Sequence, residues 1–226
     1  MCSEKQMVRH AEDVLREVGL KESQTVLDCC CGSGIYTTAA AQLVAEKGLV
    51  YAIDTNSEKL KDLRRTIKSR KLKNIKIMEE NVESKIPLPN SSVDIVLLYD
   101  IFWYFRPKEN KLTRLLQEVC RVSKSTTAIS IYPAHLDLHE LKSLKNEMES
   151  KCFNLESEYS KQLVHEGRIE KGRLLNFKKT KNQVKKLEQQ IDDLKARFPA
   201  HSVSPSMIEE LEDLEEKLAD AKMKRT

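Results

Sequence analysis

The residues whose types and spacing most clearly suit a chemical role follow an apolar run that begins at Val26. Asp28 lies at the end of this run, and a turn containing Gly32 and Gly34 comes soon after it. Glycine adopts backbone angles that other residues avoid, and it lets a ligand approach the main chain closely. Twenty residues beyond Gly34, Asp54 ends a second apolar run, where dinucleotide-type folds place their ribose-binding acid. This unit predicts a loop that binds a nucleotide cofactor.

A second set of candidate side chains follows the apolar run that ends near Leu98. Residues 99–105 form an aromatic segment that includes Asp100. Ligands of open α/β sheets bind beyond the carboxyl ends of the strands, so we expect this segment to form one wall of the substrate pocket. The alternative is that its rings close the core over the sheet edge. The side chains expected to line the pocket are Tyr36, Phe102, Trp103, Tyr104 and Tyr132.

Two families use such a glycine-bearing unit, and residue types separate them. A nicotinamide-binding loop would carry a third glycine where this chain has Thr37, and an apolar residue or glycine in place of Asp28. The stretch instead resembles motif I of the class I S-adenosylmethionine-dependent methyltransferases, D-x-G-x-G-x-G, with Cys30 at the first glycine position. The chain is most similar to the broad type 11 group, which includes quinone-biosynthesis enzymes.

The resemblance continues in register beyond this motif. Residues 52–56 resemble motif II, whose acid accepts hydrogen bonds from both ribose hydroxyls of the cofactor. Residues 80–83 are similar to the G-D-A-E segment that binds adenine, with Asn81 in place of the acid. The resemblance implies that the cofactor is S-adenosyl-L-methionine. The residues that it implies as cofactor ligands are Asp28, Cys30, Gly32, Gly34, Asp54, Thr55, Asn81, Val82 and Asp100.

The same resemblance implies methyl transfer from a sulfonium, whose leaving group is already activated. Alignment of donor and acceptor in a water-poor pocket can therefore supply most of the acceleration, and a general base is optional. If a base is used, the candidates are Asp100, Tyr36 and His135, with Tyr132 as a further one.

A small-molecule acceptor is expected, because residues 99–102 lack an N-P-P-Y-type signature for amine methylation. Three alternatives stay open. The adjacent cysteines suggest a metalloid acceptor, and a basic stretch at residues 64–73 suggests RNA. Cys30 and Asn81 depart from the family motifs, which suggests a cofactor-binding scaffold that has lost turnover and acts through its C-terminal segment.

Strands that alternate with helices would position these residues. The patterns predict strands at residues 25–29, 49–53, 75–78, 94–98 and 127–132, and helices at 4–18, 35–46, 57–70, 109–122 and 138–150. Residues 153–164 and 173–178 flank Gly167 and Gly172 as the strands of a long hairpin would. The expected class is α/β, with a doubly wound, mostly parallel seven-stranded sheet of the Rossmann-like methyltransferase type in residues 1–179, after a lead-in helix.

Residues 180–226 are expected to form a second domain, an antiparallel helical hairpin or coiled coil. Its start signal for the second helix is Ser204 followed by Pro205, or Ser206 with Glu209. Its apolar stripe would pack on the first domain or, as we favour, on a second copy or a protein partner. The stripe consists of Val184, Leu187, Ile191, Leu194 and Phe198, then Ile208, Leu211, Leu214, Leu218 and Ala221.

Composition limits the remaining possibilities. The 226 residues are 40% hydrophobic and 33% charged, with a net charge of +4. Because the net charge is low and no aromatic residues interleave with the basic stretch at residues 64–73, a solvated helix end is favoured over a nucleic-acid patch. No signal-peptide region or membrane-length apolar run is present, which predicts a soluble, cytoplasmic protein. The six cysteines do not form a spaced disulfide framework. Strand alternation would point Cys30 away from Cys29 and Cys31, so no metal is expected.

Overall fold

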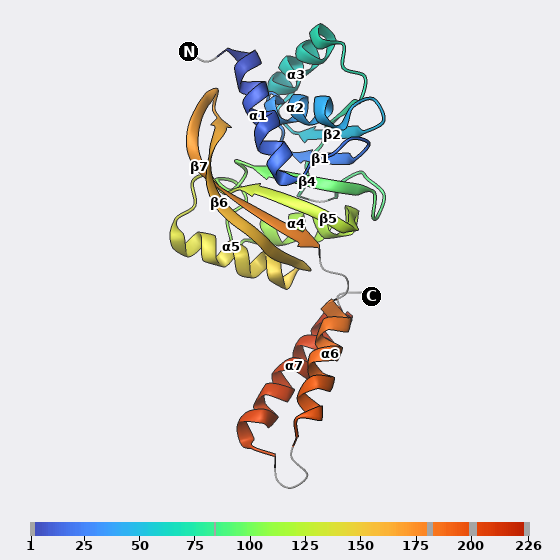
Figure 1. The fold of residues 1–226 in the computed structure, drawn as a ribbon, viewed down its shortest axis with the longest axis vertical. Coiled ribbons are helices and arrows are strands. Elements are labelled where there is room, and N and C mark those ends of the chain that lie inside the picture. The colour runs from blue at the N-terminus through green and yellow to red at the C-terminus, as the bar shows by residue number, and fades with distance from the viewer. Residues whose placement is uncertain (1–2, 84, 180–182, 199–202, 224–226) are drawn as a thin grey trace. The chain divides into compact units, whose positions relative to one another are not determined.

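One sheet of seven strands, in the order β3-β2-β1-β4-β5-β7-β6, organises the first part of the chain (Figure 1). The first five strands along the chain pair in parallel, while β7 is antiparallel to both β5 and β6. This is the expected doubly wound, mostly parallel sheet. The strands are β1 (Thr25–Cys29), β2 (Leu49–Asp54), β3 (Ile75–Glu79), β4 (Val93–Tyr99), β5 (Ser123–Tyr132), β6 (Phe153–His165) and β7 (Arg168–Lys179).

The computed structural model describes residues 3–83, 85–179, 183–198 and 203–223. Its packing divides into two compact units, Met1–Lys179 and Thr180–Thr226. The helices of the first unit are α1 (Glu4–Val18), α2 (Ile35–Val44), α3 (Ser57–Arg70), α4 (Asn110–Val122) and α5 (Leu138–Ser150). Among the described residues, no helix combines the length and the apolar character that a bilayer crossing needs.

Helices cover both faces of the sheet, as its near-continuous apolar strands require. On one face, α1 and α2 pack over side chains such as Val26, Val50 and Leu97. On the other face, α4 and α5 pack over Val96 and Ile129. A capping box at Ser3 begins α1, because its hydroxyl accepts from the Gln6 amide and the Gln6 side chain accepts from the Ser3 amide. Both faces are therefore buried, and ligands can reach the sheet at the ends of its strands.

The β6–β7 hairpin is tighter than the sequence predicted. Its second strand begins at Arg168, and the turn consists of Glu166 and Gly167, both with positive φ. Gly172 was expected to lie in the connection, but it lies within β7. A Cβ atom at Gly172 would approach the Tyr132 ring to 2.6 Å, so close packing explains this glycine. The long hairpin brings the end of β6 to the carboxyl ends of β4 and β5.

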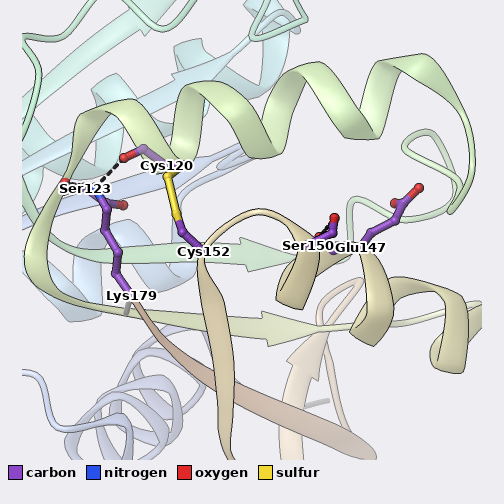
Figure 2. The surroundings of a disulfide bond; sticks show 6 residues. All are labelled: Cys120, Ser123, Glu147, Ser150, Cys152 and Lys179. Atoms are coloured by element: carbon purple, nitrogen blue, oxygen red, sulfur yellow. Dashed lines mark hydrogen bonds between the residues drawn. A yellow bond between two sulfur atoms is a disulfide. The ribbon is translucent and has the colours of Figure 1, made fainter. Parts of the chain in front are cut away.

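A disulfide joins Cys120 in α4 to Cys152, which directly precedes β6 (Figure 2). Nearby, the Lys179 ammonium donates to the carbonyl oxygens of Cys120 and Ser123 at 2.6 and 2.7 Å. Burial lowers the pKa of this lysine. The sequence was not expected to form a disulfide framework, and the Cys120–Cys152 pair was not predicted. The two cysteines are 32 residues apart, so no local pattern links them.

The second unit contains α6 (Gln183–Ala196) and α7 (Pro205–Met223). The side chains of Leu187, Ile191 and Leu194 are buried, and α6 packs against α7. Of the two predicted start signals for the second helix, the first is correct, since α7 begins at Pro205 and the Met207 amide donates to the Ser204 hydroxyl. Residues 199–202 of the predicted break lie outside the described residues.

Candidate functional site

The loop between β1 and α2 has the backbone conformation that its glycines suggest. Gly32 and Gly34 have φ values of +56° and +81°, and Gly34 is the N-cap residue of α2. A Cβ atom at Gly34 would lie 2.4 Å from a methyl carbon of Leu63, and the positive φ adds strain for any side chain, so both observations favour glycine there. Cys30 also has a positive φ, +57°, which explains why the family motif carries glycine at this position. The strand ends at Cys29, so the expected alternation of the three cysteine side chains stops there.

Asp28 is the most deeply buried acid of the site, with 3% of its surface exposed. The Thr37 hydroxyl donates to its Oδ2 atom at 2.5 Å. Burial raises the pKa of Asp28 to about 7; the hydrogen bond from Thr37 opposes this shift and the charge of Asp54 adds to it. A carboxyl group with this pKa gains stability from a cationic ligand placed beside it.

Asp54 ends β2, and its carboxylate forms a hydrogen bond with the glycine loop. Its Oδ2 accepts from the Gly32 amide at 2.7 Å and its Oδ1 accepts from the Asn56 amide at 2.8 Å. A carboxylate has about four acceptor positions. Each oxygen therefore keeps capacity for one further donor, which is what the two hydroxyls of a ribose would require.

The segment after β3 supplies the next side of the site. Val82 is buried, and the Asn81 side-chain oxygen accepts from the Glu83 amide at 2.8 Å. That oxygen was predicted to accept from an adenine amine. It can still do so through its second lone pair, because an amide oxygen accepts two hydrogen bonds.

A cavity of about 960 Å³ connects these segments with the carboxyl ends of β4 and β5. All of the predicted cofactor ligands line it except Gly34, whose positive φ is part of the loop's backbone conformation. Further lining residues that the sequence analysis did not single out include Ser33, Asn56, Lys59, Glu80, Tyr99, Val164, His165 and Gly167. Four of these, Ser33, Asn56, Glu80 and Tyr99, lie next to a predicted residue, and Lys59 lies in the helix after Asp54, whereas Val164, His165 and Gly167 come from the distant hairpin.

The aromatic wall is smaller than predicted. Tyr36, Trp103, Tyr104 and Tyr132 line the cavity. Phe102 does not, and its assignment to the pocket is wrong: the chain turns after β4, with the Tyr104 amide bonded to the Ile101 carbonyl, so that the fully buried Phe102 ring points into the core. For this ring the core-closing alternative is correct.

The exposed aromatic side chains Trp103 and Tyr104 differ in exposure and in their contacts. Trp103 is 61% exposed and Tyr104 is 40% exposed. The Lys111 ammonium lies 4.0 Å from the centroid of the Tyr104 ring, and the Tyr104 hydroxyl donates to Glu83. Tyr104 is thus held at the rim, while Trp103 is the large apolar side chain there with the most exposed surface.

Tyr36 is a poor candidate for a general base. Its hydroxyl accepts from the Val164 amide at 2.9 Å, and its ring packs edge-on against Tyr99 with a centroid distance of 4.5 Å. Burial raises the pKa of Tyr36 well above its usual value. The same cause raises the pKa of Tyr132, whose hydroxyl donates to Glu170. Both hydroxyls therefore stay protonated at neutral pH.

Asp100 and His135 come together at the carboxyl ends of β4 and β5. The Asp100 amide donates to the Tyr132 carbonyl, and the His135 Nε2 atom lies 3.3 Å from Asp100 Oδ1. His165, at the end of β6, places its Nε2 atom 2.9 Å from Asp100 Oδ2. His165 was not predicted from the sequence, where its one signal was its position before the Glu166–Gly167 turn. His139, in contrast, is exposed on α5.

The cysteines and the basic stretch give little support to a metalloid or RNA acceptor. Burial raises the pKa of the Cys30 thiol to about 12 and also raises those of Cys29 and Cys31, so their reactive thiolate forms are scarce. In the basic stretch, Arg65 pairs with Asp62 and Arg70 pairs with Glu4. These pairs fit the predicted solvated helix end.

Comparison with known proteins places this geometry in a family. The sequence model of a family described as a methyltransferase domain matches residues 20–192. A demethylmenaquinone methyltransferase from Geobacillus stearothermophilus is 33% identical over 113 residues, which are 50% of this chain and 46% of the relative. The chain thus matches its curated relatives over about half of their length.

Solved structures share the fold. A SAM-dependent methyltransferase from Aquifex aeolicus superposes with a TM-score of 0.61 at 23% identity, over 80% of this chain and 100% of that one. A second SAM-dependent methyltransferase, from Methanosarcina mazei, gives a TM-score of 0.59 at 20% identity, over 75% of this chain and 98% of that one.

Proposed function

The chain belongs to the class I S-adenosylmethionine-dependent methyltransferases, and we propose that its acceptor is a small molecule that binds over the carboxyl ends of β4 and β5. The observation that carries this proposal is the single cavity of about 960 Å³ that joins the glycine loop to that edge of the sheet. Ligand pockets usually measure about 300–1,000 Å³. A cavity at the top of this range has room for the cofactor and an acceptor together.

The residues of the loop end fit S-adenosyl-L-methionine. We assign the ribose hydroxyls to Asp54, which keeps free acceptor capacity on both oxygens. The main chain at Cys30 and Gly32, both with positive φ, would approach the methionine part. Asn81 and Val82 would contact the adenine.

Asp28 adds a charge argument to this fit. A buried carboxyl group with a pKa of about 7 is poised to ionise when a cation arrives. The amino group of the methionine part is such a cation. The assignment predicts that cofactor binding lowers the pKa of Asp28 and releases a proton from it.

When bound, the cofactor supplies a methyl group activated by its positive sulfur. The residues of this chain then have two tasks, to orient the acceptor and to exclude water. The packed rings of Tyr36 and Tyr99 close the floor of the cavity, and electron-rich ring faces attract a cation by about 0.5–2 kcal/mol. Asp100 and His135 remain as groups that can accept a proton, whereas Tyr36 stays protonated.

The relatives guide the choice of acceptor. Proteins that match half of this chain are named demethylmenaquinone methyltransferases, so demethylmenaquinone is the first acceptor to test. The aromatic and apolar rim at Trp103 and Tyr104 is compatible with a flat apolar molecule.

The experiment is transfer of an isotopically labelled methyl group to a panel of metabolites that includes demethylmenaquinone. A labelled product made by the wild-type protein and not by the Asp54→Ala variant supports the proposal. Asp62→Asn, on the exposed surface of α3, is the matched control and should keep full activity. Tight cofactor binding without any labelled product would favour the scaffold alternative.

A further inference from the structure

Three side chains that bind metals in other proteins converge on the wall of the cavity. Asp100 follows β4, His135 follows β5 and His165 ends β6. Their ligand atoms all lie within 4.8 Å of one another. All three residues line the cavity, so the group opens toward the space assigned to the acceptor.

A second layer of residues fixes the orientation of the His165 ring. Its Nδ1 atom lies 2.6 Å from Glu170 Oε1, and the same carboxylate oxygen accepts from the Tyr132 hydroxyl at 3.0 Å. A carboxylate accepts hydrogen bonds and does not donate them, so Nδ1 carries the proton in this contact. In the neutral ring, Nε2 is then left with a lone pair. Metal-binding histidines characteristically have such a carboxylate behind them.

The lone pair of His165 faces a second carboxylate. His165 Nε2 lies 2.9 Å from Asp100 Oδ2, yet Nε2 is buried and has no hydrogen-bond partner. Asp100 Oδ1 is likewise buried without a hydrogen-bond partner, although His135 Nε2 is 3.3 Å away. Two acceptors at such short distance repel each other unless a proton or a metal cation lies between them.

We propose that Asp100, His135 and His165 bind a divalent transition-metal cation, with Zn²⁺ as the representative ion. Nitrogen and oxygen ligands lie about 2.0–2.2 Å from Zn²⁺, which places neighbouring ligand atoms about 2.8–3.6 Å apart in tetrahedral or octahedral sites. The Nε2 atoms of His165 and His135 lie 2.9 and 3.3 Å from the two different oxygens of Asp100, within this range, while one ligand atom from each of the three residues gives separations of up to 4.8 Å. The half-exposed ring of His135 can move inward to complete the set.

The donor set also selects the kind of cation. Imidazole nitrogens suit Zn²⁺, Fe²⁺ and similar ions, while Mg²⁺ and Ca²⁺ prefer oxygen ligands. Three protein ligands leave at least one position open, as in catalytic rather than structural sites. Asp100 and His135 both have positive φ, +54° and +67°. Strained backbone of this kind concentrates at functional sites.

The place of the cation suggests what it does, and this step rests on the proposed function. The open position faces the cavity beside Tyr132, where the acceptor would lie. A cation there would hold an acceptor through an oxygen atom. The acceptor class is therefore a molecule with a hydroxyl or carbonyl oxygen next to the atom that receives the methyl group.

The test is titration of Zn²⁺ into chelator-treated protein that carries no histidine tag, followed by calorimetry and metal analysis after desalting. We expect one Zn²⁺ per chain for the wild type and no retained equivalent with Mg²⁺. His135→Ala and His165→Ala should each lower the affinity at least about tenfold, and Glu170→Gln by about 10–100-fold. His139→Ala, exposed on α5, is the matched control and should bind as the wild type does.

Three results would overturn the inference. Absence of Zn²⁺ binding would show that only a proton lies between His165 and its carboxylates. Normal binding by His135→Ala would show that the cluster does not act as a set, and normal binding by both histidine variants would show that the ion binds elsewhere on the chain. Affinity for S-adenosyl-L-homocysteine, measured in parallel, separates the two proposals: its retention without Zn²⁺ binding rejects the cation site alone, and its absence rejects the proposed function.

Discussion

Main-chain groups define one end of the cavity, and side chains define the other. At the loop end, Asp54 holds the main-chain amides of Gly32 and Asn56, and the conformation of the loop does most of the positioning. At the other end, Asp100 follows β4 and His165 ends β6, two strands that are far apart in the chain, and side chains form most of the wall. The difference indicates a site in which the cofactor end is defined by the backbone of the fold, while the acceptor end can change through single substitutions.

The largest effect is expected at the loop end. Asp54→Ala removes a carboxylate that bonds two loop amides and, as we propose, two ribose hydroxyls. Hydrogen bonds to a charged group contribute about 1.5–3 kcal/mol each, so affinity for S-adenosyl-L-homocysteine should fall at least about a hundredfold. The thermal shift produced by increasing ligand concentration measures this loss. Asp62→Asn should show the wild-type thermal shift. A wild-type shift for Asp54→Ala as well would show that the Asp54 carboxylate does not contact the cofactor.

Asp28 gives the next largest effect, as a pH dependence of stability without ligand. Its folded pKa is raised from 3.8 to about 7, so between these values the folded state binds more protons than the unfolded state. The free energy of unfolding should therefore fall by about 1.4 kcal/mol per pH unit as pH rises through this window, and level off above pH 7. Asp28→Asn keeps an oxygen for Thr37 and should lack this contribution. Denaturant unfolding at several pH values tests it; parallel curves for the two proteins would contradict it.

The acceptor end should respond differently. Trp103→Ala removes the most exposed ring of the wall, and KM for the acceptor should rise by about tenfold, since such aromatic contacts contribute about 0.5–1.5 kcal/mol. Affinity for S-adenosyl-L-homocysteine should stay unchanged. Leu138→Ala, which removes an exposed apolar side chain outside the cavity, is the control. If Trp103→Ala instead lost affinity for S-adenosyl-L-homocysteine and kept its KM for the acceptor, Trp103 would belong to the cofactor end of the cavity.

A smaller effect, on the free energy of unfolding, is expected from substitution of Cys30, whose φ of +57° is strained for a residue with a side chain. Cys30→Gly should change the free energy of unfolding by no more than about 1 kcal/mol, in the stabilising direction, because relief of strain exceeds the added entropy of the unfolded chain. Cys29→Gly, in the buried strand β1, should be clearly destabilising. Equal losses in denaturant unfolding for both variants would show that packing of Cys30 outweighs its backbone strain.

The smallest effect on the cavity should come from removal of residues 181–226. Affinity for S-adenosyl-L-homocysteine should stay within about twofold, since residues of the first unit line the whole cavity. We still expect the hairpin to carry an oligomer or partner contact, so the truncated protein should be smaller in light scattering than the loss of residues explains. An unchanged state of assembly would exclude self-association through this segment.

The contrast between the two ends also explains what the sequence could predict. Residues 25–54 contain the strand, the turn and Asp54 in one short stretch, so their spacing alone predicts how they meet. The wall made by Asp100, His135 and His165 depends on the pairing of β7 with β5, which brings the end of β6 to the site; the hairpin was predicted, but no local pattern reveals this pairing. Phe102 was misassigned because its side-chain direction depends on a turn after β4. The Cys120–Cys152 pair was missed because it bridges distant elements.

The most direct test of the account is calorimetric titration of the purified wild-type protein with S-adenosyl-L-homocysteine. The central claim is that the turn at Gly32 and the carboxylate of Asp54 form one cofactor site. We predict a single site per chain and release of a proton on binding between pH 6 and pH 8, because Asp28 ionises there; the observed enthalpy should therefore change with the ionisation enthalpy of the buffer. No detectable binding to either this product or the methyl donor would contradict the account.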